Sequence, residues 1–260
     1  MIEWLFGDFT LLQIAILALG AAIIGINKTA IPALGALVMV MFTQFFPADI
    51  ASAAVLPLLC TGDVLAVAWY RRVANWKFVI TLLPWAMVGL VLGMIVVRLI
   101  TSTDALAVVI ALIILGVQAL SISRGAFQKK IDEWRGSMGM AAFFGIMAGF
   151  TTQVANAAGP VMAIYLLLMK FSKEEYIGSA AWYFLLLNWM KLPLFAMDGR
   201  LTWQVIRMVP GVLPFMIMGA AIGILLLKNI SQKSFNWIIQ LLTALGALRL
   251  LWMGLENLLK

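Results

Sequence analysis

The sequence contains no histidine and only one cysteine, Cys60, and these two absences exclude several familiar kinds of functional site. Without histidine, the chain lacks the commonest general base, zinc ligand and proton relay of proteins. A single cysteine rules out a disulfide within the chain. Because a serine–histidine pair cannot form either, we expect a protein that is not an enzyme and that uses no cofactor or metal.

Charged residues are also scarce, since they make up 11% of the chain while hydrophobic residues make up 64%. No soluble domain of this size shows that balance. Apolar runs of about 20 residues recur from end to end, which predicts an all-α, polytopic membrane protein. The net charge of +7 lies largely in short loops between these runs, as the positive-inside bias expects. The lipid bilayer is therefore an expected partner and nucleic acid is not, while a homo-oligomer stays open.

The hydrophobic runs predict ten segments, near residues 9–26, 31–46, 49–70, 76–98, 104–122, 137–150, 157–170, 175–195, 203–226 and 233–255. The second five resemble the first five at an offset of roughly 125–130 residues. The matching positions are Pro32 with Pro160, Trp76 with Trp203, and Pro84-x4-Gly89-x3-Gly93 with Pro214-x4-Gly219-x3-Gly223. We therefore predict two internal repeats, residues 1–122 and 137–260, joined by a cytoplasmic loop at 123–136.

Polar residues interrupt the first part of each repeat, at Gly25–Pro32 and again at Thr151–Pro160. Thirty-odd residues in one helix would run about 50 Å, well beyond the roughly 30 Å hydrocarbon core. Each part is therefore expected to fold back as a broken helical hairpin or as two short spans, with three transmembrane helices after it. An odd number of crossings per repeat would invert the two repeats, whereas a single kinked span would make them parallel. The length favours inversion.

We expect very few charges within the hydrocarbon region: Lys28 in the first break, Asp63 in the middle of segment 49–70 and Lys191 near the middle of segment 175–195. Each costs about 2.5 kcal/mol or more at the bilayer centre unless it is paired or hydrated. Their charges sum to +1, so one anion would neutralise the group. Asp63 is the only acidic residue well inside a segment, which excludes an aspartyl dyad. We expect it to couple transport to protons or to be the counter-ion of Lys191.

The two breaks supply hydrogen-bonding groups in matching positions, which is typical of the substrate site of a secondary transporter. Proline suits the first turn of the helix that follows each break, and Asn27 or Thr29, and Asn156, stand where helix caps are expected. Those helices would direct their N-terminal amides and dipoles toward the break. The candidate substrate-binding residues are Asn27, Lys28, Thr29, Gln153, Asn156, Asn188 and Lys191.

These motifs resemble those of a known family. The stretch Gly-Ile-Asn-Lys-Thr-Ala-Ile-Pro-Ala-Leu-Gly at 25–35 resembles the first-repeat motif of the sulfite exporter TauE/SafE family, residues 149–166 resemble its partner, and Asn188-x2-Lys191 resembles a pattern of one branch. The resemblance implies a multi-pass transporter of small anions such as sulfite, sulfoacetate or related sulfonates in a bacterial inner membrane. It also implies that Asn27, Lys28, Asn156 and Lys191 bind the substrate. Thr-Thr-Gln at 151–153 departs from the usual glycine-rich pattern and indicates more hydrogen bonding to the ligand.

Together these patterns predict a secondary transporter that moves a small anion by alternating access, coupled to protons through Asp63. The nearest alternative is an anion channel or facilitator, which would show no dependence on Asp63 and no saturation at modest concentration. The other alternative is a structural membrane subunit that transports nothing. In such a subunit, Lys28→Ala and Lys191→Ala would change stability at most and would have no specific effect on ligand binding.

Overall fold

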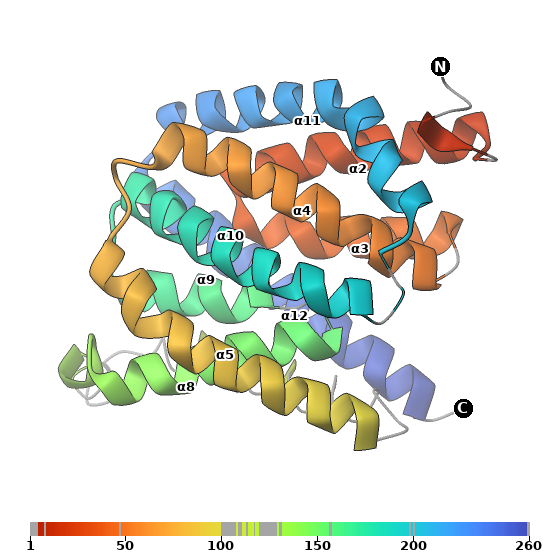
Figure 1. Ribbon diagram of the computed structural model, residues 1–260. Helices are drawn as coiled ribbons and strands as arrows, with labels where there is room; N and C mark the ends of the chain where they lie inside the picture. The colour runs from red at the N-terminus through yellow and green to blue at the C-terminus, as the bar shows by residue number, and fades with distance from the viewer. Residues whose placement is uncertain are drawn as a thin grey trace. The chain divides into compact units, whose positions relative to one another are not determined.

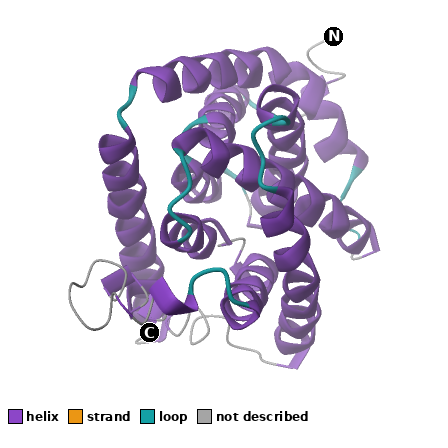
Figure 2. Cartoon of the chain, turned by 90° about the vertical axis from the view of Figure 1, so that its left-hand side faces the viewer, coloured by secondary structure: helices purple, strands orange, loops and turns teal. Residues whose placement is uncertain are grey.

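The computed structural model describes residues 5–7, 9–46, 48–99, 108, 111–112, 114–116, 118–119, 129, 132–155, 158–197, 199 and 201–258. Nearly all of these residues are helical, and none of them forms a strand (Figure 2). The predicted all-α class is confirmed for this part of the chain. The predicted segment 104–122 and the connecting loop 123–136 fall largely outside the described residues.

The helices are α2 (Leu11–Thr29), the 3₁₀ turn η1 (Pro32–Leu34), α3 (Gly35–Phe45), α4 (Ala48–Tyr70), α5 (Trp76–Leu99), α8 (Met138–Ala155), α9 (Ala158–Leu168), α10 (Lys173–Met197), α11 (Trp203–Asn229) and α12 (Gln232–Leu258) (Figure 1). Among the described residues, six stretches are long and apolar enough to cross a membrane, on α2, α4, α5, α10, α11 and α12. The predicted polytopic membrane protein is therefore confirmed. Helices α3 and α9, with 11 residues each, rise only about 16 Å, roughly half of a hydrocarbon core.

The chain divides into two compact units, and each unit combines segments from both halves of the sequence. Unit 1 consists of residues 1–74 and 173–231 and holds α2, η1, α3, α4, α10 and α11. Unit 2 consists of residues 75–172 and 232–260 and holds α5, α8, α9 and α12. The predicted boundaries at 122 and 137 describe a sequence repeat and stay a prediction.

In unit 1, α2 and α3 form a helical hairpin. The Thr10 side chain caps α2 and forms a capping box with Gln13. The Gln13 Nε2 also donates a hydrogen bond to the Phe45 carbonyl oxygen at the end of α3, at 3.1 Å. Midway along the hairpin, Gly20 lies directly against the Phe42 ring, with no space for a Cβ atom. These contacts show that the chain folds back at the first break, as the length argument predicted.

Helix α2 also packs along α11 in unit 1, and the two helices lie side by side in Figure 1. A Cβ atom at Gly25 would overlap the Met216–Ala220 backbone, and one at Gly219 would overlap the backbone of Ala22. Further on, Gly223 meets Ile26 and Thr29. The contacts advance together along both helices, so α2 and α11 run in the same direction. Glycine is required because the two backbones approach closely, as small residues commonly allow between membrane helices.

Helices α4 and α10 of unit 1 run in opposite directions. Leu56 and Cys60, in the first half of α4, pack with Phe195 near the end of α10. Ala66, further along α4, packs with Ala181 in the first half of α10. The middle of each helix therefore faces the middle of the other.

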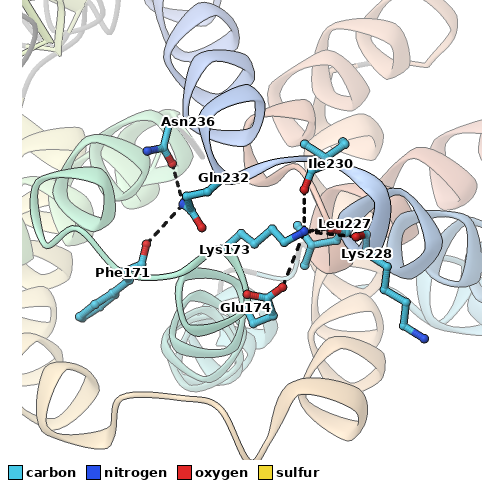
Figure 3. Close-up of polar contacts among 8 residues, drawn as sticks. All are labelled: Phe171, Lys173, Glu174, Leu227, Lys228, Ile230, Gln232 and Asn236. Atoms are coloured by element: carbon cyan, nitrogen blue, oxygen red, sulfur yellow. Dashed lines mark hydrogen bonds and ion pairs between the residues drawn. The ribbon is translucent and has the colours of Figure 1, made fainter.

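The start of α10 is fastened to the end of α11 by one lysine. The Lys173 Nζ donates hydrogen bonds to the carbonyl oxygens of Leu227 at 2.5 Å, Ile230 at 2.5 Å and Lys228 at 3.3 Å (Figure 3). The last carbonyls of a helix lack partners within the helix, so a lysine there satisfies them and complements the helix dipole. Within unit 2, the start of α12 is held similarly, because the Gln232 Nε2 donates to the Phe171 carbonyl and to the Asn236 Oδ1 (Figure 3).

In unit 2, α8 and α9 also fold back on each other. The Arg135 Nε, just before α8, donates a 2.7 Å hydrogen bond to the Leu168 carbonyl at the end of α9. Asp132 pairs with both Arg135 and Lys170 at this open end. Further in, the rings of Phe144 and Tyr165 stack with centroids 4.8 Å apart. The second interrupted segment is therefore a hairpin as well.

Helix α8 packs closely along α5 within unit 2. A Cβ atom at Gly145 would overlap Leu82 and Trp85, and one at Gly149 would overlap the Ala86 carbonyl. Gly93 of α5, in turn, meets the Gln153 side chain. The contacts again advance together, so α8 and α5 run in the same direction. On α12, a stripe of exposed apolar side chains suits contact with lipid: Trp237, Leu241, Leu245, Leu248 and Trp252.

Candidate functional site

A fully buried carboxylate, that of Asp63 on α4, lies at the centre of the polar contacts inside unit 1. The Lys28 Nζ lies 2.7 Å from its Oδ1, and the Asn188 Nδ2 donates a 2.7 Å hydrogen bond to its Oδ2. Both oxygens therefore have a polar partner from another helix. Burial of an ionised group is costly unless it is paired and hydrogen-bonded, and this arrangement meets both conditions.

Lys28 reaches Asp63 from the last turn of α2, where a cation complements the helix dipole. Its side chain is only 7% exposed, and its Nζ lies 4.7 Å from the centroid of the Phe184 ring on α10. The approach of α2 to α4 depends on Gly62, because a Cβ atom there would lie 3.0 Å from Lys28 Cγ and 3.0 Å from Ile24 Cγ2. A glycine beside the aspartate thus permits the short ion pair.

Lys191 lies three residues after Asn188 on α10, and its side chain is 1% exposed. Its Nζ is 5.5 Å from the centroid of the Phe195 ring. Lys28, Asp63 and Lys191 are the charged residues that are buried in the described part of the chain. We refer to these three residues together with Asn188 as the charged cluster. Its formal charge is +1, the sum predicted from the sequence.

The sequence placed the polar residues of the first break between helices, but the structure places them within α2, which continues to Thr29. Asn27 was expected to cap the next helix, but the N-cap position of α3 is Leu34. From within α2, the Asn27 Oδ1 instead accepts a 2.7 Å hydrogen bond from the Gly35 N–H, the first amide of α3. Thr29 does not cap it. Its hydroxyl donates instead to the carbonyl oxygens of Gly25 at 2.8 Å and Ala220 at 3.1 Å. This back-bonding keeps a β-branched residue inside a helix and ties α2 to α11.

The polar residues before the second break likewise lie inside a helix, because α8 runs to Ala155 rather than ending near 150. The buried Thr151 hydroxyl donates to the Ala148 carbonyl at 3.2 Å, again within its own helix. The Gln153 Oε1 is buried and has no hydrogen-bond partner among the described residues. Asn156 lies outside the described residues. The structure therefore brings Lys28, Asp63 and Asn188 together in unit 1. Lys191 is buried in the same unit, three residues after Asn188 on α10, while Gln153 belongs to unit 2.

Sequence reasoning missed the aromatic side chains that accompany the two buried lysines. Phe184 and Phe195 stand four residues before Asn188 and four residues after Lys191, so they share one side of α10 with the polar pair. An aromatic face attracts a nearby ammonium group, most strongly where water is excluded. The helical spacing Phe-x3-Asn-x2-Lys-x3-Phe was the signal that could have identified them.

The chain was compared with known proteins, and the family model of the sulfite exporter TauE/SafE matches residues 14–250. The chain belongs to the sulfite exporter TauE/SafE family. No curated protein matches it, and no solved structure does. The TauE/SafE match covers nearly the whole chain, including all four residues of the charged cluster. The family predicted from the two breaks is confirmed, and membership indicates a membrane transporter of sulfite-like anions rather than an enzyme.

Proposed function

We propose that this chain is a secondary transporter that binds a small anion, such as sulfite, a sulfonate or a related organic anion, at the charged cluster. The observation that carries the proposal is that the charged side chains of Lys28, Asp63 and Lys191 are buried in unit 1, with Lys28 in the last turn of α2 before the break of the hairpin. A membrane protein keeps ionisable groups in its interior at a cost, and such groups commonly mark a substrate path. An anion that enters offsets that cost.

The contacts suggest a separate role for each residue. Lys191 supplies a second buried ammonium group for the anion, and Asn188 orients the carboxylate of Asp63. Asp63 is the proton-coupling group. Protonation of its carboxylate would remove the negative charge that pairs with Lys28 and would change the charge of the cluster. The side chains of Asn27 and Thr29 form hydrogen bonds to backbone groups. Their proposed role in substrate binding is therefore to hold the backbone of the first break in position. Thr151, Thr152, Gln153 and Asn156 are proposed to offer uncharged hydrogen bonds at the second break.

We also propose that residues 1–122 and 137–260 are inverted repeats linked by 123–136. Three observations within the units support this. The matched glycines Gly89/Gly93 of α5 and Gly219/Gly223 of α11 each receive the first helix of a broken hairpin. That helix runs parallel to its partner in both cases. Helices α4 and α10, which correspond in the two repeats, run in opposite directions, as inversion requires. Inverted repeats are the usual basis of alternating access around a fixed site.

The proposed setting is the inner membrane of a bacterium, where the protein would be a multi-pass transporter. An anion channel or facilitator shares the buried positive charge but needs no titratable carboxylate. Asp63, held between two helices by Lys28 and Asn188, is the feature that favours a coupled transporter over a channel. The family match favours a transporter over a structural subunit, since the family is one of exporters.

The proposal is tested by transport into liposomes that contain the purified full chain. Labelled sulfite and sulfoacetate are supplied outside, with and without an imposed pH gradient. We expect saturable uptake that responds to the gradient and falls to background in Lys191→Gln. Lys233→Gln is the matched control, since Lys233 is exposed on α12. Each variant is first checked for a single peak in size-exclusion chromatography and for an unchanged melting temperature.

Three results would count against the proposal. Uptake that does not saturate and ignores the gradient indicates a channel. Equal uptake by the wild type and a well-folded Lys191→Gln removes the charged cluster as the site. Absence of uptake for every small sulfur-containing anion, in either direction, favours a structural role.

A further inference from the structure

We infer that a pocket where α4 and α11 end and α10 begins binds the head group of a zwitterionic phospholipid that carries a phosphate and a primary ammonium group, as phosphatidylethanolamine does. This lipid is a partner of unit 1 distinct from the transported anion. None of the residues that line the pocket belongs to the charged cluster.

The pocket lies between three helix ends of unit 1 and has a volume of about 230 Å³. Its lining residues are Trp69, Tyr70, Val73, Glu174, Leu227 and Lys228. The start of α10 packs tightly against the end of α4, because a Cβ atom at Gly178 would lie 3.0 Å from the Tyr70 carbonyl oxygen. Since Lys173 also ties α10 to the end of α11, the helix ends around the pocket are held in place.

Two opposite charges line this pocket, and in the described part of the chain they form no ion pair with each other. The Lys228 Nζ lies 5.6 Å from the centroid of the Trp69 ring. The carboxylate of Glu174 lies 3.8 Å from the Lys173 Nζ, beyond hydrogen-bond distance. The Lys173 ammonium group donates instead to carbonyl oxygens at the end of α11, and the Lys228 side chain points away from it (Figure 3). One cation and one anion are therefore exposed side by side to a ligand in the pocket.

The pocket lies at the depth expected for lipid head groups. All three helices around it are long and apolar enough to span a membrane, and the pocket is at their ends. Trp69 is 57% exposed, and tryptophan is enriched where the hydrocarbon core meets the head groups. Arg71 and Arg72 follow directly and are exposed, as expected for a loop outside the hydrocarbon core.

An apolar stripe on α11 leads from the pocket toward the middle of the helix. Leu225, Ala221 and Met218 precede Lys228 at intervals of three or four residues, so they share its side of the helix. Leu225 is 59% exposed and Met218 is 52% exposed. From Met218 to Lys228 the helix rises about 15 Å, roughly half of a hydrocarbon core. An acyl chain can therefore lie along the stripe while its head group occupies the pocket.

The two charges select the head group. Phosphate oxygens accept hydrogen bonds from the Lys228 ammonium group, and a primary ammonium group donates hydrogen bonds to the Glu174 carboxylate. A choline head group carries the same phosphate but has no N–H to donate. The glycerol head group of an anionic lipid offers Glu174 no positive charge. The pocket therefore favours phosphatidylethanolamine over both of these lipids.

The test measures binding of three lipids with identical oleoyl chains to the purified, delipidated full chain in detergent. Phosphatidylethanolamine, phosphatidylcholine and phosphatidylglycerol are titrated, and bound lipid is measured by native mass spectrometry. We expect the wild type to bind phosphatidylethanolamine about two- to fivefold more tightly than the other two, the worth of one exposed ion pair. Soluble glycerophosphoethanolamine should bind far more weakly, because it has no acyl chain to bury.

Two variants assign the two charges. Lys228→Gln removes the partner of the phosphate, so binding of all three lipids should weaken about two- to fivefold. Glu174→Gln should weaken phosphatidylethanolamine alone and abolish its preference over phosphatidylcholine. Lys233→Gln and Glu133→Gln replace exposed residues of unit 2 and are the matched controls, which should bind as the wild type does. Each variant is first checked for an unchanged melting temperature in detergent.

Four results would overturn the inference. Tighter binding of phosphatidylglycerol by the wild type would show that excess positive charge selects the lipid. Equal binding of all three lipids by the wild type would show an unselective surface. A Glu174→Gln variant that keeps the wild-type preference would show that the carboxylate does not contact the ammonium group. Binding of glycerophosphoethanolamine as tight as that of the lipid would identify a soluble ligand instead.

Discussion

The two broken hairpins share a packing frame and differ in their chemistry. In each, the first helix runs parallel to a glycine-containing neighbour, and a side chain near the open end donates to a carbonyl at the end of the second helix. The first hairpin carries Lys28, paired with Asp63, in its last turn before the break. The second carries Thr151, Thr152 and Gln153, which are uncharged. The same packing of helices therefore accommodates charged side chains at the first break and uncharged polar side chains at the second.

The largest expected effect concerns the charge in the first hairpin. Asp63→Leu leaves Lys28 buried without its carboxylate partner, so the free energy of unfolding should fall by about 3–5 kcal/mol. The double variant Lys28→Met/Asp63→Leu should recover most of that loss, because it removes both members of the pair. Denaturant unfolding in detergent, followed by tryptophan fluorescence, measures both. If the single variant were as stable as the wild type, the Lys28–Asp63 pair would not distinguish the first break energetically from the uncharged second break.

A smaller effect tests whether the two frames are equivalent. Gly219→Ala places a Cβ atom against the Ala22 carbonyl in unit 1, and Gly149→Ala places one against the Ala86 carbonyl in unit 2. Each should cost about 1–3 kcal/mol, since the helices must separate to make room. Gly116→Ala is the control, because a Cβ atom there meets nothing within 4 Å. If thermal unfolding showed one of the two glycines to be dispensable, the shared frame would hold for only one hairpin.

The smallest effect belongs to the neutral break. Gln153→Leu removes a buried oxygen that has no partner among the described residues, so stability should change little. If this oxygen-bearing amide bonds the anion, affinity for sulfite should fall about two- to tenfold, the worth of one hydrogen bond. Gln44→Leu on the exposed end of α3 is the matched control. Unchanged affinity, measured by calorimetry, would make the polar residues of the second break purely structural.

The sequence was sufficient to predict the features that depend on composition and spacing. The apolar runs predicted the spans, and the length of the interrupted segments predicted the fold-back. It named Lys191 as the lysine for which Asp63 would be the counter-ion, whereas the structure pairs Asp63 with Lys28. The choice follows from the packing of α2 against Gly62, which no pattern of charges reveals. The sequence also predicted that the first helix ends near residue 26, because polar residues follow. The helix continues to Thr29, whose hydroxyl donates a hydrogen bond to the Gly25 carbonyl of the same helix.

The division of the chain has a consequence for how the protein is made. Unit 1 needs residues 1–74 and 173–231, so the ribosome must complete most of the chain before this unit can close. Asp63 meets its amide partner 125 residues later in the sequence. Helices α2 and α4 therefore enter the membrane carrying a lysine and an aspartate that have only each other. The Lys28–Asp63 ion pair joins two helices that are synthesised before α10, so it needs no residue from the second half of the chain.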